Sequence, residues 1–227
     1  MKLLVFSDLH GEEAALESLQ RIAPDFDHVL ICGDISRSVS FAEDVLKAFP
    51  TAFIIPGNWD SEQVNTVLAS SRQWLHGKRV KLGKSLSIAG FGYSPPTPFG
   101  TFGELSEQDI LSGMAKLKMD SNTLLMLHCP PKGHFDQGML GRHIGSESIL
   151  KMIKENKPLA AFFGHAHEHE GTAKLGQTTL VKLPPANSMR ACSVVLAEHK
   201  ISQNFVRHGK SSDLPCNKKL SVEFISL

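Results

Sequence analysis

Five apolar segments of the chain each end in a short group of residues that can bind metal ions. The groups are Asp8-Leu9-His10, Gly33-Asp34, Gly57-Asn58-Trp59-Asp60, His128 and Gly164-His165-Ala166-His167. Carboxylate oxygens, imidazole nitrogens and one amide oxygen make a mixed ligand set, which suits manganese, iron, zinc, cobalt or nickel better than calcium. The residue types therefore predict a site for two divalent transition-metal ions.

Each of these residues taken alone is more often structural. Asp34, which follows Gly33, could simply begin a turn, and a single histidine is commonly a core residue with a hydrogen-bond partner. Such candidates at five successive segment ends are harder to explain in that way. In Asp8-x-His10 and His165-x-His167, alternation in an extended segment also places both side chains on one side.

The charges of the candidate ligands indicate what the site would bind. Asp8 and Asp34 contribute two negative charges, whereas the histidines and Asn58 are neutral as ligands. If Asp60 is not a ligand, two divalent ions and one bridging hydroxide leave the centre with a charge near +1, which suits a phosphate anion. Paired ions also stabilise the attacking and leaving oxygens of an in-line displacement. The sequence thus favours hydrolysis of a phosphate ester by a metal-bound hydroxide.

The elements that must position these residues alternate regularly in the first part of the chain. Apolar runs predict strands at 2–6, 29–32 and 52–55, and periodic apolar positions predict helices at 12–23, 41–49 and 61–69. This alternation predicts parallel strands covered by helices. Sites in such sheets form at the carboxyl ends of the strands, where all five groups of candidate ligands lie.

The rest of the chain is less regular. We expect strands at 85–89, 124–127 and 159–163, helices at 106–118 and 146–156, and a Pro- and Gly-rich loop at 91–103. After Gly171 we expect consecutive antiparallel strands at 178–183, 189–197 and 201–206, with a turn at 198–200, and a late edge strand at 220–225. No domain boundary is evident, so residues 1–227 are expected to form one domain, of which the tail at 209–227 is the least defined part.

Composition excludes several other classes of protein. The chain has 227 residues and a net charge of +1, and no basic face or motif indicates a nucleic-acid partner. The densest basic stretch, Lys78 to Lys84, is expected to be a solvated hairpin. No apolar run approaches the ~18 residues of a membrane span, and the N-terminal run is too short for a signal peptide. Four cysteines without a CxxC pair favour free thiols and a cytoplasmic protein.

Taken together, the motifs D-x-H, G-D, G-N-x-D, a lone His and G-H-x-H resemble those of the calcineurin-like metallophosphoesterases. The stretches PTPFGT, HCPPKG and HIGS also resemble the prokaryotic, Icc-related branch of these phosphoesterases. The resemblance implies an α/β fold, a four-layer α/β/β/α sandwich of two mixed sheets flanked by helices. By position it implies that Asp8, His10, Asp34 and His167 hold one metal ion. Asp34 would bridge to a second ion held by Asn58, His128 and His165.

One position departs from the family pattern. Many members have histidine after the motif Asn, where it helps to protonate the leaving group, and this chain has Trp59. Loss of a general acid typically slows a reaction ~10²–10⁴-fold. We therefore expect phosphodiesters with good leaving groups to be favoured over monoesters, with Trp59 walling the pocket or stacking on substrate. His143 is the candidate substitute acid and Arg142 a candidate phosphate contact, although both could instead lie in a solvated loop.

Two functions from different classes fit this sequence. One is a metal-dependent phosphoesterase acting on a small phosphate ester, and the other is a protein-binding scaffold of the same fold with little or no activity. The complete set of candidate ligands favours the enzyme. The physiological substrate, the native metal and the oligomeric state are not indicated by the sequence.

Overall fold

Strand β1 (Lys2–Phe6) lies inside the first of two sheets and is buried on both faces, which explains its unbroken apolar run. It pairs in parallel with β2 (His28–Cys32) and antiparallel with β10 (Arg190–His199). The sheet continues in parallel to β3 (Phe53–Ile55) on one side, and ends antiparallel at β11 (Asn217–Ser226) on the other. The strand order is β11-β10-β1-β2-β3. The computed structural model describes residues 1–138, 141–199 and 217–227.

The second sheet has six strands, in the order β4-β5-β6-β7-β9-β8. Its parallel centre consists of β5 (Leu86–Phe91), β6 (Thr123–Leu127), β7 (Ala160–Phe163) and β9 (Thr178–Lys182). Its antiparallel edges are β4 (Lys78–Leu82) and β8 (Gly171–Leu175). The β4–β5 pairing confirms that the basic stretch from Lys78 forms a hairpin.

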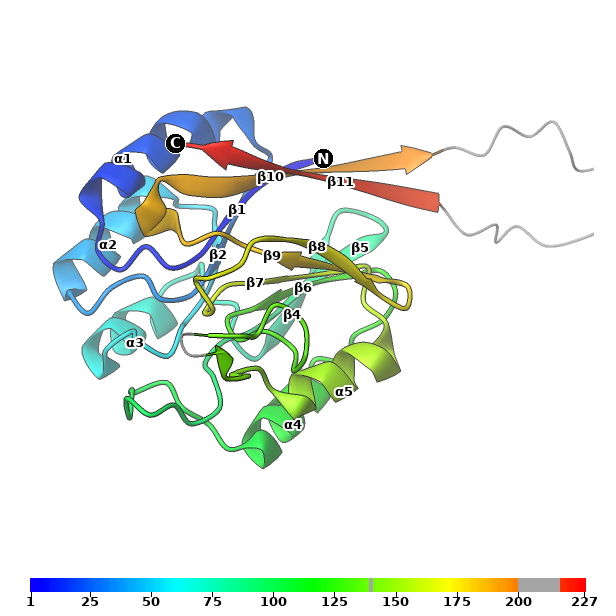
Figure 1. Ribbon diagram of the computed structural model, residues 1–227. Coiled ribbons are helices and arrows are strands. Elements are labelled where there is room, and N and C mark those ends of the chain that lie inside the picture. The colour runs from blue at the N-terminus through cyan, green and yellow to red at the C-terminus, as the bar shows by residue number, and fades with distance from the viewer. Residues whose placement is uncertain (139–140, 200–216) are drawn as a thin grey trace, which may run out of the picture.

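Helices cover the outer faces of both sheets (Figure 1). The first sheet packs against α1 (Glu13–Ile22), α2 (Val39–Ala48) and α3 (Glu62–Ala69), and the second against α4 (Glu107–Ala115) and α5 (Glu147–Asn156). Alternate residues of β1 show the layering, because Leu4 packs toward the helices and Leu3 toward the second sheet. These layers confirm the expected four-layer α/β/β/α sandwich of two mixed sheets.

Serine side chains set the starts of several helices. Ser61, Ser106 and Ser146 each precede a helix and accept a hydrogen bond from the backbone N–H three residues later. The carboxylate of Glu107, at the start of α4, also accepts hydrogen bonds from the Ser146 hydroxyl and the Ser148 N–H. The start of α5 is thereby fixed against α4, and the segment before α5 is anchored at its C-terminal end.

The strand pattern after Gly171 differs from the expectation. Strands β9 and β10 are not neighbours, because β9 lies in the second sheet and β10 crosses back to pair with β1 in the first. The expected turn at 198–200 is wrong in its first two residues, since β10 continues through His199. Lys200 and the expected strand at 201–206 lie outside the described residues. The late edge strand is confirmed by β11.

No helix in the described part of the chain is long and apolar enough to cross a membrane. Cys32, Cys129 and Cys192 are buried free thiols. Two short 3₁₀ helices lie at Ala23–Asp25 and Ala186–Ser188.

Candidate metal centre

The seven candidate ligands lie at the carboxyl ends of strands from both sheets. Strands β1, β2 and β3 of the first sheet and β6 and β7 of the second each end immediately before one group of candidates. The seven side chains are those of Asp8, His10, Asp34, Asn58, His128, His165 and His167. The structure brings all seven together at the same edge of the two sheets, as the parallel strands require.

Four of these residues form one group around Asp8. The Nε2 atom of His167 lies 3.3 Å from Oδ1 of Asp8 and 3.4 Å from Nε2 of His10. The same His10 atom lies 3.9 Å from Asp8 Oδ1 and 3.7 Å from Asp34 Oδ2. The other oxygen of Asp8, Oδ2, accepts a hydrogen bond from the Ser7 hydroxyl, and the His165 N–H lies 3.2 Å from Oδ2 and 3.4 Å from Oδ1. Oδ1 is the oxygen that faces the rings of His10 and His167.

The other group contains Asp34, Asn58, His128 and His165. Nε2 of His128 lies 3.4 Å from Asp34 Oδ1 and 3.0 Å from Asn58 Oδ1. The rings of His128 and His165 meet edge-on at 5.0 Å, and Nε2 of His165 is buried with no hydrogen-bond partner among the described residues. The two oxygens of Asp34 therefore face different groups, with Oδ2 toward His10 and Oδ1 toward His128.

Hydrogen bonds determine which atoms Asn58 and His128 direct at each other. Glu104 accepts hydrogen bonds from the N–H and the hydroxyl of Thr101, so the Thr101 oxygen can accept one from Nδ2 of Asn58, at 2.9 Å. Nδ1 of His128 donates to the Cys32 carbonyl at 2.9 Å, which leaves a lone pair on Nε2. Asn58 Oδ1 and His128 Nε2 are thus two acceptors 3.0 Å apart. A cation bound by both atoms would resolve this repulsion.

The charges in this region also fit bound cations. Asp8, Asp34 and Asp60 are carboxylic acids with at most 2% of their surface exposed. Burial, together with the neighbouring Asp8 and Asp60 charges, raises the pKa of Asp34 well above its usual value. Burial opposes ionisation of Asp8 as well, but the hydrogen bond from His167 and nearby positive groups hold the pKa of Asp8 below its usual range. Positive ions here would allow all three acids to ionise.

Three of the four histidines are in the protonation state that metal binding needs. Burial lowers the pKa of His10, of His128 and, to about 3, of His165. These rings are therefore neutral at pH 7, and neutral imidazole is the form that coordinates metals. His167 differs, because its hydrogen bond with Asp8 raises the pKa of its ring.

Backbone geometry is unusual at the same residues. Asp8, His10, Asp34 and His165 all have positive φ, between 49° and 71°, a region that residues other than glycine rarely adopt. Such conformations cluster at functional sites, where the surrounding structure holds them. Two glycines, Gly57 and Gly164, allow the backbone to lie directly against the carboxylates of Asp34 and Asp8. A Cβ atom would lie 2.0 Å from Asp34 Oδ1 if added to Gly57, and 2.2 Å from Asp8 Oδ2 if added to Gly164.

Asp60 ties the loops after β2 and β3 together. Its Oδ1 accepts hydrogen bonds from the N–H groups of Ile35, at 2.7 Å, and Ser36, at 3.0 Å, and its Oδ2 accepts one from Gly57 at 2.7 Å. Both oxygens are thus occupied by backbone donors. Asp60 positions the loops that carry Asp34 and Asn58, which agrees with leaving it out of the candidate ligands.

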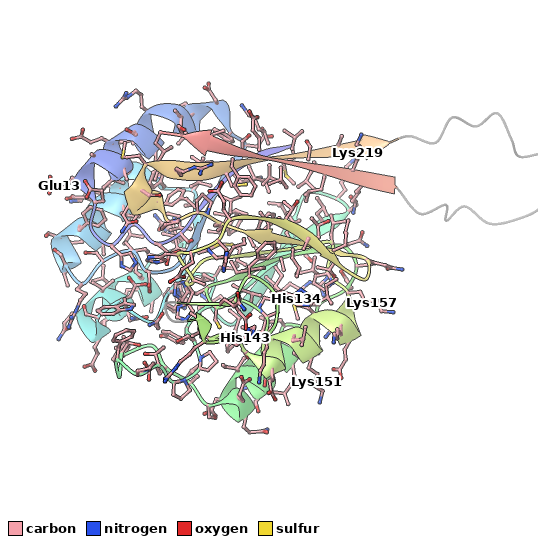
Figure 2. All side chains as sticks on the ribbon, viewed as in Figure 1. Glu13, His134, His143, Lys151, Lys157 and Lys219 are labelled. Atoms are coloured by element: carbon pink, nitrogen blue, oxygen red, sulfur yellow. The ribbon has the colours of Figure 1, made fainter. Side chains whose placement is uncertain are left out.

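The three other candidate residues lie at two different places. Trp59 and Arg142 line a pocket of about 480 Å³ that also contains five of the candidate ligands. His143 lines a neighbouring pocket of about 310 Å³ instead, where its Nδ1 pairs with Asp136 Oδ1 at 2.8 Å. Figure 2 labels His143 and His134, both from the segment between β6 and α5. The acid role of His143 stays a prediction.

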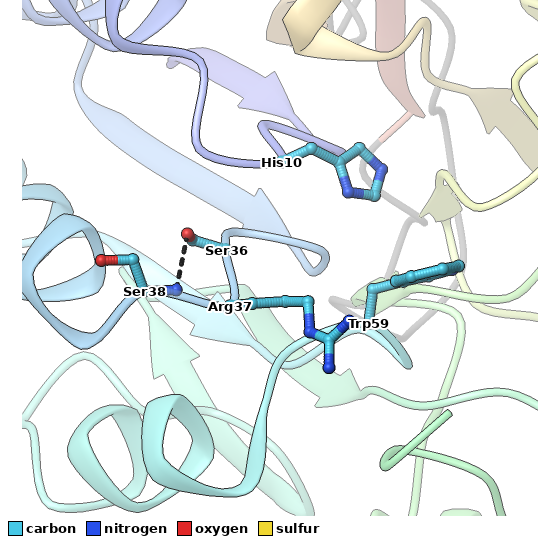
Figure 3. Close-up of a pocket in the computed structure, with 5 residues that line it drawn as sticks. All are labelled: His10, Ser36, Arg37, Ser38 and Trp59. Carbon is cyan, nitrogen blue, oxygen red and sulfur yellow. Dashed lines mark hydrogen bonds between the residues drawn. The ribbon is translucent and has the colours of Figure 1, made fainter. Parts of the chain in front are cut away.

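The structure also places residues at the site that sequence reasoning did not single out. Arg37 and Ser36 line a pocket of about 300 Å³ that shares His10 and Trp59 with the larger one (Figure 3). Phe99 and Glu168 line the larger pocket. The PTPFGT stretch was a signal for Phe99 and Thr101, whereas nothing in the spacing indicated Arg37.

Comparison with known proteins agrees with this geometry. The model of the calcineurin-like phosphoesterase family matches residues 1–169. An uncharacterised protein of Methanocaldococcus jannaschii is 30% identical over 200 residues, which cover 82% of this chain and 88% of that protein.

Two solved structures share the fold at lower identity. The phosphopantetheinyl hydrolase of Mycobacterium tuberculosis has a TM-score of 0.62 at 15% identity, covering 82% of this chain and 90% of that one. A dimetal phosphatase from Danio rerio has a TM-score of 0.53 at 13% identity, covering 86% and 92% respectively.

Proposed function

Because this chain belongs to the calcineurin-like phosphoesterase family, we propose that it is a hydrolase that uses two divalent transition-metal ions to cleave phosphate esters. One ion is held by Asp8, His10, Asp34 and His167, and the other by Asp34, Asn58, His128 and His165. The observation that carries this proposal is the pair of acceptors, Asn58 Oδ1 and His128 Nε2, that face each other at 3.0 Å. The orphaned Nε2 of His165 supports the same assignment.

Bound metal ions supply a nucleophile derived from water at neutral pH and neutralise charge that develops on the phosphate. The protein's own contribution is the orientation of the ligands. Ser7 and the His165 N–H hold one oxygen of Asp8, Cys32 fixes the tautomer of His128, and Thr101 fixes the amide of Asn58. Partners of this kind typically change metal affinity or activity ~10–100-fold when they are removed.

Two arginines at the pockets are suited to bind the phosphate ester. Arg37 and Arg142 are exposed, and neither forms an ion pair with any described residue. Since guanidinium groups bind phosphate oxygens in a bidentate manner, these side chains are available for substrate. Arg142 lines the larger pocket and Arg37 the smaller one, and Trp59 lines both.

Phosphodiesters are favoured over monoesters because the position after Asn58 holds Trp59. Its indole lines the pocket and carries no proton that can be transferred to a leaving group. A substrate with an acidic leaving group needs less protonation, so aryl diesters are the expected substrates in an assay. Manganese is the ion we propose to test first, followed by zinc, iron, cobalt and nickel.

The direct test is hydrolysis of bis(p-nitrophenyl) phosphate by protein reconstituted with Mn²⁺. We expect metal-dependent release of nitrophenolate that is lost in Asp34→Asn, since Asp34 faces both groups of ligands. The matched control is Asp44→Asn, which removes an exposed carboxylate on α2 and is expected to retain activity. Equal activity in Asp34→Asn and wild type would overturn the proposed mechanism. Absence of hydrolysis with each of the five metals would favour a binding scaffold instead.

A further inference from the structure

Part of the lining of the larger pocket is an apolar wall, and the rest includes five of the candidate metal ligands. The apolar wall consists of Trp59, Pro98, Phe99 and Ile144. Phe99 exposes 73% of its surface and Trp59 38%, and their ring centroids lie 6.0 Å apart with the planes inclined at 47°. Large exposed apolar groups beside a polar site are typical of surfaces that bind a ligand.

Hydrogen bonds connect both aromatic residues to candidate metal ligands, directly for Trp59 and through a chain of side chains for Phe99. The N–H of Trp59 donates to Asp34 Oδ1 at 2.9 Å. Phe99 lies in a loop that Glu104 closes, because Glu104 accepts from the hydroxyls of both Thr97 and Thr101, and Thr97 accepts from the Phe99 N–H. Thr101 in turn accepts from the side chain of Asn58. These bonds hold the wall at a fixed place relative to the metal centre.

Another residue that lines the pocket, Arg142, adds a group that can pack on a ring. Arg142 and Ile144 come from the segment before α5 and line the pocket together with Phe99. A guanidinium group stacks favourably on an aromatic face. The pocket of about 480 Å³ is therefore large enough for a six-membered ring next to a phosphate group, with aromatic and cationic neighbours for that ring.

From these contacts we propose that Trp59 and Phe99 bind an aromatic ring carried by the phosphate ester, and that Phe99 is a residue that determines this specificity. The proposal rests on the proposed function, since it assumes that the phosphate group lies at the metal centre. The substrate class is then an ester of phosphate with a flat aromatic substituent, rather than one with only small alkyl substituents.

The test measures binding by calorimetry to the Mn²⁺-reconstituted protein, with phenylphosphonate, cyclohexylphosphonate and methylphosphonate as probes. All three present the same anionic group, so their differences report on the wall alone. We expect phenylphosphonate to bind about tenfold more tightly than methylphosphonate and about threefold more tightly than cyclohexylphosphonate, because aromatic pairs add to simple burial of apolar area.

Phe99→Ala is expected to reduce the preference for phenylphosphonate over methylphosphonate to about twofold. Phe102→Ala is the matched control, because Phe102 is an exposed phenylalanine of the same loop that does not line the pocket; it should leave the preference unchanged. In hydrolysis of bis(p-nitrophenyl) phosphate, Phe99→Ala should raise KM with little change in kcat.

Equal affinity for all three phosphonates, equal affinity for the phenyl and cyclohexyl compounds, or failure of all three to bind would each overturn the aromatic specificity. The same holds if Phe99→Ala and Phe102→Ala behave alike. Failure of the proposed function has a different result, namely no metal-dependent hydrolysis by wild type, and the phosphonate preference is measured whether or not hydrolysis occurs.

Discussion

The side chains of Asn58 and Thr101, 43 residues apart in sequence, are joined by a hydrogen bond of 2.9 Å from Nδ2 to Oγ1. This bond orients the amide so that its oxygen faces Nε2 of His128. It also joins the loop after β3 to the loop that carries Phe99, a link strengthened by the hydrogen bond from the Gly103 N–H to the Asn58 carbonyl. The candidate ligand Asn58 and the loop that carries Phe99 are therefore held together by these two hydrogen bonds.

Thr101→Val should weaken metal binding without unfolding the protein. Valine has nearly the shape of threonine but cannot accept the hydrogen bond from Asn58, so the amide is free to rotate. We expect about tenfold weaker affinity for the ion held by Asn58, as is usual when a partner of a ligand is lost. Competition with a metal-binding dye would measure it. Thr97→Val removes a hydroxyl that also donates to Glu104 but does not contact Asn58, and a similar loss there would contradict the prediction.

Asp60→Asn should destabilise the fold. An asparagine amide directs N–H groups at one of the backbone donors that Asp60 now accepts from, so at least one buried N–H loses its partner. We expect a loss of about 2–4 kcal/mol in the free energy of unfolding, measured with urea. The exposed Asp44→Asn should change this free energy by less than about 1 kcal/mol. Equal effects of the two substitutions would show that the hydrogen bonds accepted by Asp60 contribute little to the free energy of unfolding.

His76 should make stability depend on pH. Its ring packs 4.9 Å from Phe91 and 4.8 Å from Tyr93, its Nδ1 accepts from the Gly92 N–H, and burial lowers its pKa from 6.5 to about 4. The unfolded chain therefore binds a proton between about pH 6.5 and pH 4 that the folded chain does not. Stability present above pH 6.5 is lost as the pH falls through this window, by roughly 2–3 kcal/mol.

The measurement for His76 is urea unfolding at pH 7.5 and pH 5 for wild type and His76→Gln. Other buried histidines also titrate, so the difference between the two proteins isolates His76. The loss of stability on acidification should be smaller in His76→Gln. An identical loss in both would mean that His76 takes up its proton with the same affinity in the folded and unfolded states.

If His143 protonates the leaving oxygen, its removal should most affect substrates with basic leaving groups. Asp136, which is buried, holds Nδ1 of His143 and leaves Nε2 toward solvent. Rates of His143→Ala and wild type should be compared across aryl diesters of graded leaving-group pKa, and a steeper dependence in the variant supports the role. His134→Ala is the control from the same segment. A uniform loss would assign His143 to positioning the loop, and no loss would assign it to the solvated surface.

Sequence patterns predicted most of the strands and helices, and the position of the candidate ligands at strand ends, because both depend on local signals. Apolar runs of three to five residues ending in Asp, Asn or His are visible in one dimension, as are helix starts at Ser61, Ser106 and Ser146. Partner choice of the later strands was not predictable in this way. Strand β10 pairs with β1, nearly the whole chain away, and no turn residue marks that long-range pairing.

The pocket walls were less predictable than the ligands for the same reason. Phe99 sits beside Trp59 because hydrogen bonds to Glu104 fold the loop back, a consequence of tertiary contacts rather than of periodicity. Placement of His143 in a neighbouring pocket, away from Arg142, follows from the pairing of its ring with Asp136. Adjacent residues in an irregular segment can face different cavities, and the sequence alone does not indicate which.

The two groups of ligands each draw on both sheets, and this has a consequence for how the protein is made. Asp8, His10, Asp34 and Asn58 leave the ribosome early, but His165 and His167 follow β7, more than 150 residues after β1. A nascent chain that ends before β7 therefore holds an incomplete set of donors for either ion. If the chain binds the two proposed ions, their capture would be a late event in synthesis, and it would secure the packing of the second sheet against the first only once both have been assembled.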